Sequence, residues 1–326
     1  MSTGSPPSSL LFLKPGSFGD IVHALPCAAA LKLYWPKTTL TWLVDERWQP
    51  LLEGNPHLDE IVTFPRQQFR GLGGKIRSIP WAMALKRLHP DLALDLQGLI
   101  RSALMAKLSR AGKIVGLGDA REGASWFYDE VTPVQPGEHA VLRYLRSLQS
   151  LGIPRPTQLE FTLPAGTAPS KPIPSSFILL HPFARGAGKS LTPEQVIQLA
   201  AALRPHRVVI AGQGKLDAPL PEHAISLLNQ TNISELIWLL RAASVVVSVD
   251  SGPMHIAAAV GSKLLSIHTW SDPREVGPFN ENAWIWQGGT IRRQQLTPAE
   301  ALPTPRPMES MDLARLAEWA DGQMKA

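Results

Sequence analysis

Residues 245–259 read VVVSVDSGPMHIAAA, and the order of their residue types predicts the fold class. A run of β-branched residues ends at Asp250, a Ser-Gly-Pro turn follows, and a helix of small apolar residues begins at once. A strand that leads directly into a helix is the repeating unit of a parallel sheet covered by helices on both faces. The stretch therefore predicts an α/β protein whose chemistry lies in the loops at the carboxyl ends of its strands.

The same alternation of strands and helices occurs on both sides of residues 152–176, which contain six prolines and have the composition of a linker. A length of 326 residues suits two domains. We expect a domain over 1–160 and another over 161–326, forming a ligand cleft, with a final amphipathic helix at 311–324 that packs back on the N-terminal domain. The expected strands are 9–14, 39–45, 91–98, 113–118, 177–182, 207–212, 224–228, 245–250 and 263–268, and the expected helices include 20–34, 75–88, 192–203, 233–243 and 254–260.

Composition and charge narrow the class of protein. A single cysteine, Cys27, excludes a disulfide scaffold and a four-cysteine zinc site and favours the cytosol. No stretch approaches the roughly 20 apolar residues that span a bilayer. Residues 66–113 carry ten basic side chains against Asp91 and Asp95, an excess of +8 that indicates an anionic partner or, less specifically, a solvated helical face.

The first strand is followed by the loop KPGSFGD, residues 14–20. Its spacing matches neither the dinucleotide fingerprint nor a P-loop. Asp20 falls at the start of the next helix, where a carboxylate can act as a general base or simply cap that helix. The sequence leaves both roles open.

Two loops of the second half contain residues suited to binding a diphosphate. The amides of Ser251 and Gly252 at a helix start attract anions, and Asp250 can accept hydrogen bonds from sugar hydroxyls. Arg185 and Lys189, in the glycine-rich loop after the strand 177–182, can neutralise a leaving diphosphate. Both loops also have an interpretation without a ligand. The first would only cap a core helix, and the lysine of the second would be a solvated surface residue. The chain has no Asp-x-Asp pair and no His-Glu-x-x-His motif, so a diphosphate would leave without a metal.

Three motifs, taken together, resemble a known family. They are Lys14 with Gly19-Asp20 and Pro26, then DLQGLIRS at 95–102, and DSGPMHIAAA at 250–259. In order and spacing they are similar to the bacterial heptosyltransferases of lipopolysaccharide core synthesis, glycosyltransferase family 9, and most of all to the type I, ADP-heptose:Kdo, branch.

The resemblance implies a GT-B fold of two Rossmann-like, doubly wound parallel-sheet domains, with the acceptor on the N-terminal domain and the nucleotide sugar on the C-terminal one. It implies an inverting, metal-independent transfer of heptose from ADP-heptose to a Kdo hydroxyl on lipid A. The enzyme is expected to need no cofactor, to bind no nucleic acid, to act as a monomer, and to sit peripherally at the cytoplasmic face of the inner membrane.

The resemblance also assigns roles to residues. Asp20 matches the general base and Lys189 the lysine near the leaving phosphate. The residues implied in donor binding are Arg185, Thr231, Asp250, Ser251, Gly252 and His255. The residues implied in acceptor binding, where guanidinium forks suit carboxylates and phosphates, are Lys14, Gly19, Arg66, Arg70, Gln97, Arg101 and Arg121.

Two alternatives stay open at this point. A GT-B transferase or an epimerase that uses another nucleotide sugar would also need a cleft and a diphosphate-binding helix. A polyanion-binding module would explain the basic segment 66–113 but would leave the turn at Asp250 without a purpose.

Overall fold

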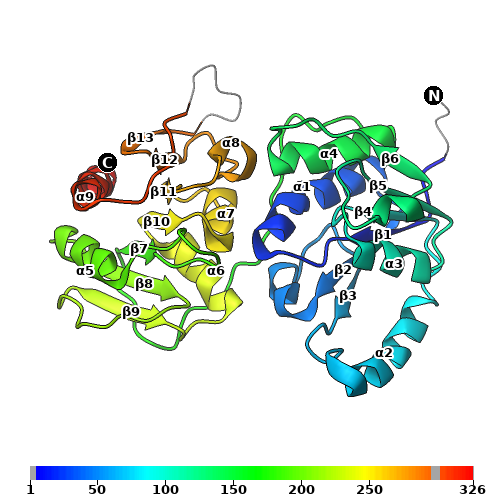
Figure 1. Ribbon diagram of the computed structural model, residues 1–326, viewed down its shortest axis with the longest axis horizontal. Helices are drawn as coiled ribbons and strands as arrows, with labels where there is room; N and C mark the ends of the chain where they lie inside the picture. The colour runs from blue at the N-terminus through cyan, green and yellow to red at the C-terminus, as the bar shows by residue number, and fades with distance from the viewer. Residues whose placement is uncertain (1–4, 295–301, 326) are drawn as a thin grey trace. The chain divides into compact units, whose positions relative to one another are not determined.

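The structure, a computed structural model, describes residues 5–294 and 302–325. The chain divides into two units, Met1–Leu163 and Pro164–Ala326, a boundary three residues beyond the expected one (Figure 1). Residues 153–177 form neither helix nor strand, in keeping with their prolines. None of the described helices is long and apolar enough to span a membrane.

Unit 1 is a parallel sheet of six strands in the order β3-β2-β1-β4-β5-β6. The chain builds outward from β1 on one side and then crosses to β4 on the other, so the loops after these two central strands diverge. Its strands are β1 (Ser9–Leu13), β2 (Thr39–Asp45), β3 (Glu60–Phe64), β4 (Leu92–Asp95), β5 (Lys113–Leu117) and β6 (Glu130–Thr132). Its helices are α1 (Phe18–Tyr34), α2 (Gly71–Leu85), α3 (Ile100–Leu108) and α4 (Ala140–Ser150), with 3-10 turns η1 (Glu46–Leu51) and η2 (Ala124–Phe127).

Unit 2 repeats this order as β9-β8-β7-β10-β11-β12, with β13 added antiparallel at one edge. Its central pair is β7 and β10, which run parallel. Its strands are β7 (Ile178–His181), β8 (Val208–Gly212), β9 (Ala224–Leu228), β10 (Val245–Val249), β11 (Leu264–Ile267), β12 (Trp284–Gln287) and β13 (Thr290–Arg293). Its helices are α5 (Pro193–Ala202), α6 (Ile233–Ala242), α7 (Gly252–Ala259), α8 (Pro273–Val276) and α9 (Ser310–Lys325).

The structure confirms two Rossmann-like doubly wound sheets and every strand and helix that the sequence predicted. The additional elements are mostly short or at sheet edges. β6 has three residues and β3 is only partly buried, so neither shows a buried apolar run.

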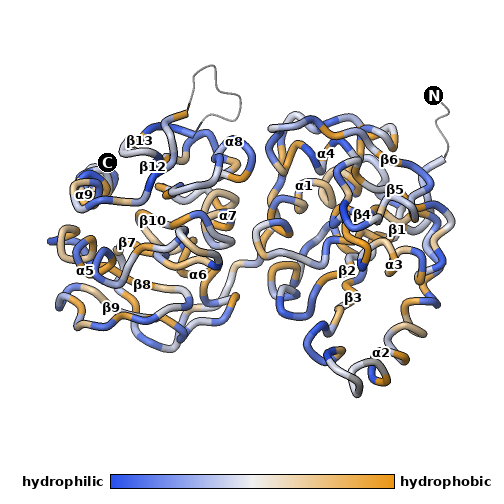
Figure 2. Tube along the Cα trace, in the orientation of Figure 1, coloured by the Kyte–Doolittle hydropathy of each residue, from blue (hydrophilic) through white to orange (hydrophobic). Residues whose placement is uncertain are grey.

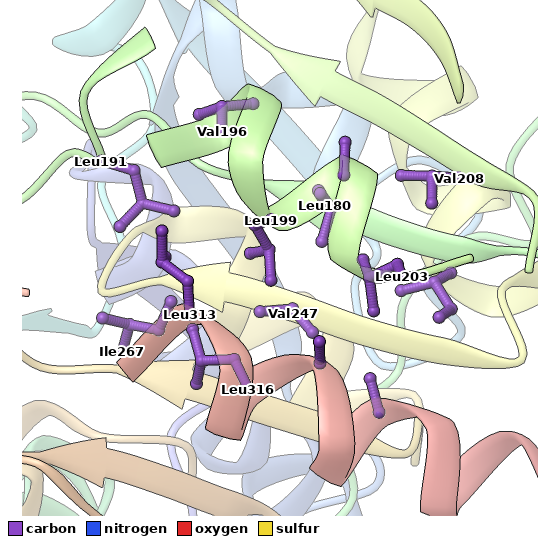
Figure 3. Close-up of a cluster of buried hydrophobic side chains, with 14 of the residues drawn as sticks. Leu180, Leu191, Val196, Leu199, Leu203, Val208, Val247, Ile267, Leu313 and Leu316 are labelled. Atoms are coloured by element: carbon purple, nitrogen blue, oxygen red, sulfur yellow. The ribbon is translucent and has the colours of Figure 1, made fainter. Parts of the chain in front are cut away.

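The final helix, α9, packs against the core of unit 2. Figure 3 shows Leu313 and Leu316 of α9 among the buried side chains of α5, β7 and β10. Leu316 and Ala320 are fully buried there, and α9 packs against α5 and β10. The buried residues of its apolar face thus pack within unit 2, and a return of the helix to the N-terminal domain stays a prediction.

Helix α1 is apolar on nearly all sides. Most of its residues from Gly19 to Leu31 are buried, and it packs against the sheet and α4; Figure 2 shows a largely hydrophobic helix beside the hydrophobic central strands. Because an ionised carboxylate is costly to bury, a helix that is buried on all sides accommodates one best near its end. Asp20 lies in its first turn.

Truncating α9 at its buried face tests this packing. Leu316→Ala should destabilise unit 2 by about 2–5 kcal/mol, because it removes a fully buried leucine and leaves a cavity. Met311→Ala, on the same helix but 60% exposed, is the control and should stay near wild type. Urea unfolding followed by tryptophan fluorescence measures both, and equal effects of the two changes would contradict the docking.

Candidate functional site

The loops after β1 and β4 are tied together at the carboxyl edge of the unit 1 sheet. The buried ammonium of Lys14 donates to the Leu96 carbonyl at 2.9 Å, and the Gly16 amide donates to Oε1 of Gln97 at 3.2 Å. Lys14 is only 2% exposed, and its Nζ lies 4.6 Å from the centre of the Tyr144 ring. These contacts join the loop that leads into Asp20 to the loop after β4.

Asp20 is half-buried and holds three hydrogen bonds. Its Oδ2 accepts from the Ser17 amide at 2.9 Å and the Ser17 hydroxyl at 2.7 Å, and its Oδ1 accepts from the Tyr144 hydroxyl at 3.1 Å. The hydrogen bond from the Ser17 amide to Asp20 caps the start of α1, which is one of the two roles that the sequence left open for Asp20. A carboxylate has about four acceptor positions, so one remains on Oδ1 for an incoming hydroxyl.

The charge state of Asp20 follows from its neighbours. Burial raises the pKa of the Asp20 carboxyl, but the charge of Lys14 and the bonds from Ser17 and Tyr144 outweigh burial and hold it below its usual value. Burial also raises the pKa of Tyr144, which therefore keeps its proton and donates it. Asp20 is ionised at neutral pH and able to accept a proton.

Tyr144 is a site residue that the sequence analysis missed. It lies on α4, 124 positions from Asp20, and its buried ring gives it the signature of an ordinary core residue. Arg143 donates to the same hydroxyl at 3.2 Å. Only the packing of α4 on α1 brings them to Asp20.

Asp95, the first residue of the second motif, organises its own loop. Its carboxylate accepts from the amides of Gln97 and Gly98 and from the hydroxyls of Ser102 and Tyr128, all within 3.2 Å. The side chain is fully buried, so this motif positions the loop rather than offering Asp95 to a substrate. Gly98 has φ +66°, and a Cβ there would meet the Ala120 backbone at 3.3 Å.

A basic surface lies beside this edge of unit 1. Arg66 and Arg70, in the loop between β3 and α2, are exposed, as is Arg101 in the first turn of α3. Partial burial and then the charges of Arg101 and Arg47 lower the pKa of Arg66, which shows that these guanidinium groups are close together. Three of the predicted acceptor residues thus form one positive cluster, suited to an anion.

The other predicted acceptor residues in this unit make contacts that hold the fold together. Gly19 is buried in the first turn of α1. Arg121 is exposed, and its amide donates to the Gly98 carbonyl at 2.8 Å, which ties the loop after β5 to the loop after β4. Lys14 acts on Asp20 through its charge, because its ammonium is buried and bonded to the backbone.

In unit 2 the loops after β7 and β10 also meet. Nζ of Lys189 lies 2.8 Å from Oδ2 of Asp250, a carboxylate that is only 5% exposed. Burial raises the pKa of Asp250, but His268, Lys189 and His255 outweigh it and bring the pKa below its usual value. Two of the residues that the sequence assigned to the donor side are therefore joined as an ion pair.

The loop after β11 completes this group. Trp270 is 58% exposed, and its ring lies 4.7 Å from Nζ of Lys189. The Thr269 hydroxyl donates to the Gly188 carbonyl at 2.6 Å, which fixes the lysine loop. Sequence reasoning missed both; a tryptophan after a buried strand, followed by Ser-Asp-Pro, was the available signal.

Helix α7 begins at this group. Its N-cap Ser251 does not cap it through the side chain; the hydroxyl instead lies 3.2 Å from Nδ1 of His181, at the end of β7. Burial lowers the pKa of His181 to about 4, so this imidazole is neutral at pH 7. Gly252 opens the helix, and the buried His255 on its first turn lies close enough to lower the pKa of Asp250. The helix start can accept an anion.

The remaining donor candidates lie at neighbouring loops. Arg185 is exposed in the loop after β7, and the half-buried Thr231 directly precedes Asn232, the N-cap of α6. Gly212 ends β8 with φ +120°, and a Cβ there would lie 2.7 Å from the His181 ring. All these positions follow the carboxyl ends of unit 2 strands, where doubly wound sheets bind ligands.

Comparison with known proteins finds relatives that align with most of the length of this chain. The lipopolysaccharide core heptosyltransferase OpsX of Haemophilus influenzae is 24% identical over 294 residues, 84% of this chain and 82% of that protein. Lipopolysaccharide heptosyltransferase 1 of Escherichia coli O18:K1:H7 is 25% identical over 312 residues, 88% of this chain and 94% of that protein.

Solved structures give the same picture of the fold. The E. coli ADP-heptose LPS heptosyltransferase II matches with a TM-score of 0.75 at 19% identity, over 97% of this chain and 98% of that one. The E. coli heptosyltransferase WaaC with ADP matches with a TM-score of 0.73 at 20% identity, over 97% and 99%. These matches confirm the expected GT-B fold.

The family model described as glycosyltransferase family 9 (heptosyltransferase) matches residues 81–297, about two thirds of the chain. The match takes in the motifs at Asp95 and Asp250, the Lys189 loop and most of unit 2. On this evidence the chain is a glycosyltransferase and belongs to glycosyltransferase family 9, the heptosyltransferase family.

Proposed function

We propose that this enzyme transfers a heptose from ADP-heptose to a Kdo hydroxyl of the lipopolysaccharide inner core, by a single inverting displacement that needs no metal. The setting of Asp20 carries the proposal: an ionised carboxylate with one open acceptor position on Oδ1, in the unit that also holds a cluster of exposed arginines. The names of the relatives support the chemistry, since they are heptosyltransferases of lipopolysaccharide and one solved relative holds ADP-2-deoxy-2-fluoro heptose.

In this proposal Asp20 takes the proton of the acceptor hydroxyl. The hydroxyl oxygen forms a bond to the anomeric carbon of the donor while the bond from that carbon to the diphosphate oxygen breaks. The electron pair leaves with ADP, and the sugar inverts its configuration. Ser17 and Tyr144 hold the carboxylate in position so that its free lone pair meets the hydroxyl.

The departing ADP gains negative charge, and in this proposal residues of unit 2 stabilise that charge. Lys189 and the amides at the start of α7 supply positive charge at the diphosphate, and Asp250 accepts hydrogen bonds from the heptose. Lys189 would exchange its partner from Asp250 to the phosphate when the donor binds. These groups take the place that a metal ion fills in other nucleotide-sugar enzymes.

The acceptor is an acidic glycolipid. Arg66, Arg70 and Arg101 suit the Kdo carboxylates and lipid A phosphates, because each guanidinium offers a planar pair of donors. Such an acceptor lies in the inner membrane, so the enzyme would work at its cytoplasmic face. The identity of about 25% to heptosyltransferase 3 as well as heptosyltransferase 1 of E. coli makes the acceptor the point to test.

The proposed base is tested by Asp20→Asn. Turnover of ADP-heptose and Kdo-lipid A should fall by about 10²–10⁴, the usual contribution of a general base, while ADP still binds. Asp129→Asn makes the same charge change at an exposed carboxylate of unit 1 and should leave turnover unchanged. Mass spectrometry of the product, run in parallel with UDP- and GDP-sugars, measures the rate and the donor. Wild-type turnover in the Asp20 variant would rule out the base.

The loss of kcat/KM on the acid side of the pH profile measures the protonation of Asp20. Because the pKa of Asp20 is held below its usual value, kcat/KM should fall only below the pH range in which an ordinary aspartate titrates. Tyr144→Phe removes a donor to the ionised form, so the fall should move to higher pH. Ser147→Ala, one turn further along α4, is the control. A fall at unchanged pH in the tyrosine variant would show that Asp20 does not set it.

The donor side is tested by Lys189→Ala. The Kd for ADP should rise about 10- to 100-fold, because a charge-assisted bond is lost and Asp250 is left facing the diphosphate. Lys215→Ala removes a lysine of the same unit that is 88% exposed and should bind ADP as wild type does. Isothermal titration calorimetry gives both constants; equal affinities would remove Lys189 from the diphosphate site.

A further inference from the structure

Helix α2 has two apolar faces. The inner face contacts the rest of unit 1: Trp81 packs against Phe64 and Phe69, its indole N–H donates to the Thr63 carbonyl at 2.7 Å, and Leu85 is fully buried. Trp81 and Leu85 are four positions apart, so they share one side of the helix. This face alone accounts for the attachment of α2 to the sheet.

The outer face is apolar and exposed. Ile76 is 71% exposed, Ile79 54% and Met83 52%. At about 100° per residue these three side chains lie within about 60° of one another, on the side of α2 opposite Trp81 and Leu85. The tube of Figure 2 shows the hydrophobic stretches along α2. Nothing in unit 1 covers this face among the described residues.

Two further exposed apolar side chains lie on elements next to α2. Leu104 of α3 is 48% exposed and Trp126 of η2 is 87% exposed, and α3 contacts both α2 and η2. Five of the ten large exposed hydrophobic side chains of the described residues therefore lie on three neighbouring elements of unit 1. A gathering of this kind marks an interaction surface.

The surroundings of the patch are basic. Residues 61–90 hold six lysines and arginines and no aspartate or glutamate. Arg77, Lys86 and Arg87 are exposed on or just after α2, and Lys107 is exposed on α3. An amphipathic helix with apolar side chains flanked by lysine and arginine is the pattern of a helix that lies in the surface of an anionic membrane.

We propose that the outer face of α2 docks on an anionic lipid bilayer, with Ile76, Ile79 and Met83 entering the interface and the basic residues around them meeting the headgroups. Charge decides between the possible occupants, because a second copy of this chain would bring two basic faces together. The proposal rests on the proposed function, which supplies a membrane-embedded acceptor. Arg70, of the acceptor cluster, is the N-cap of α2, so docking would bring that cluster to the membrane surface.

Vesicle co-sedimentation of the full chain tests the docking. Wild type should bind vesicles of phosphatidylcholine and phosphatidylglycerol and bind pure phosphatidylcholine about tenfold less. The triple variant Ile76→Ser, Ile79→Ser, Met83→Ser should lose about tenfold in binding to the anionic vesicles. Lys86→Glu with Arg87→Glu should lose binding to anionic vesicles without changing the weak binding to neutral ones.

The matched control is a triple variant at exposed hydrophobic residues elsewhere: Leu33→Ser, Val131→Ser and Met311→Ser. It should bind as wild type does, and circular dichroism should show both triples folded. The proposal is overturned if the α2 triple binds like the control. It is also overturned if sedimentation velocity shows that the α2 triple abolishes a dimer instead of vesicle binding.

Activity assays separate this proposal from the proposed function. With a water-soluble Kdo acceptor that lacks acyl chains, the α2 triple should turn over like wild type, and with vesicle-embedded acceptor it should lose about tenfold in rate. Equal losses on both acceptors would place α2 in the acceptor site and overturn the docking. If wild type binds vesicles as expected but transfers no heptose to either acceptor, the proposed function fails and the docking stands.

Discussion

Both units depend on one constraint: where a doubly wound sheet reverses its strand order, the loops after the two central strands diverge, and polar contacts must join them. In unit 1 the Lys14 ammonium at the end of β1 reaches the Leu96 carbonyl after β4. In unit 2 the His181 ring at the end of β7 reaches Ser251 after β10. These contacts fix the loops that carry Asp20 and Asp250, so the positions of the two carboxylates follow from the strand order.

The buried charge of Lys14 links this constraint to reactivity. Burial lowers the pKa of Lys14, while the nearby charge of Asp20 raises it, and the same pair of charges lowers the pKa of Asp20. Each group thus helps to keep the other ionised in a place where either alone would be costly. A carboxylate stabilised in this way is a weaker base, and proximity to the acceptor hydroxyl would have to compensate.

The sequence predicted the features that depend on neighbours along the chain. The strand, turn and helix at 245–259 are local, so Asp250 and Ser251 were identified correctly as lying at a helix start. Contacts between distant segments could not be predicted in this way. A buried tyrosine on α4 has the signature of a core residue until α4 is packed on α1. The apolar stripe of α9 showed that the helix packs, but not on which unit.

The structure places the basic residues of segment 66–113 at two different locations, and helix α2 is one of them. The sequence shows only an excess of positive charge over 66–113, which fits both an anionic substrate and an anionic surface. In the fold, Arg66 and Arg101 gather at the carboxyl edge of the sheet, whereas Arg87 follows a helix whose outer face is apolar. Phosphate and carboxylate groups need only the first arrangement, since apolar side chains add nothing to their binding. A bilayer needs the second, because lipid meets charge and hydrocarbon together.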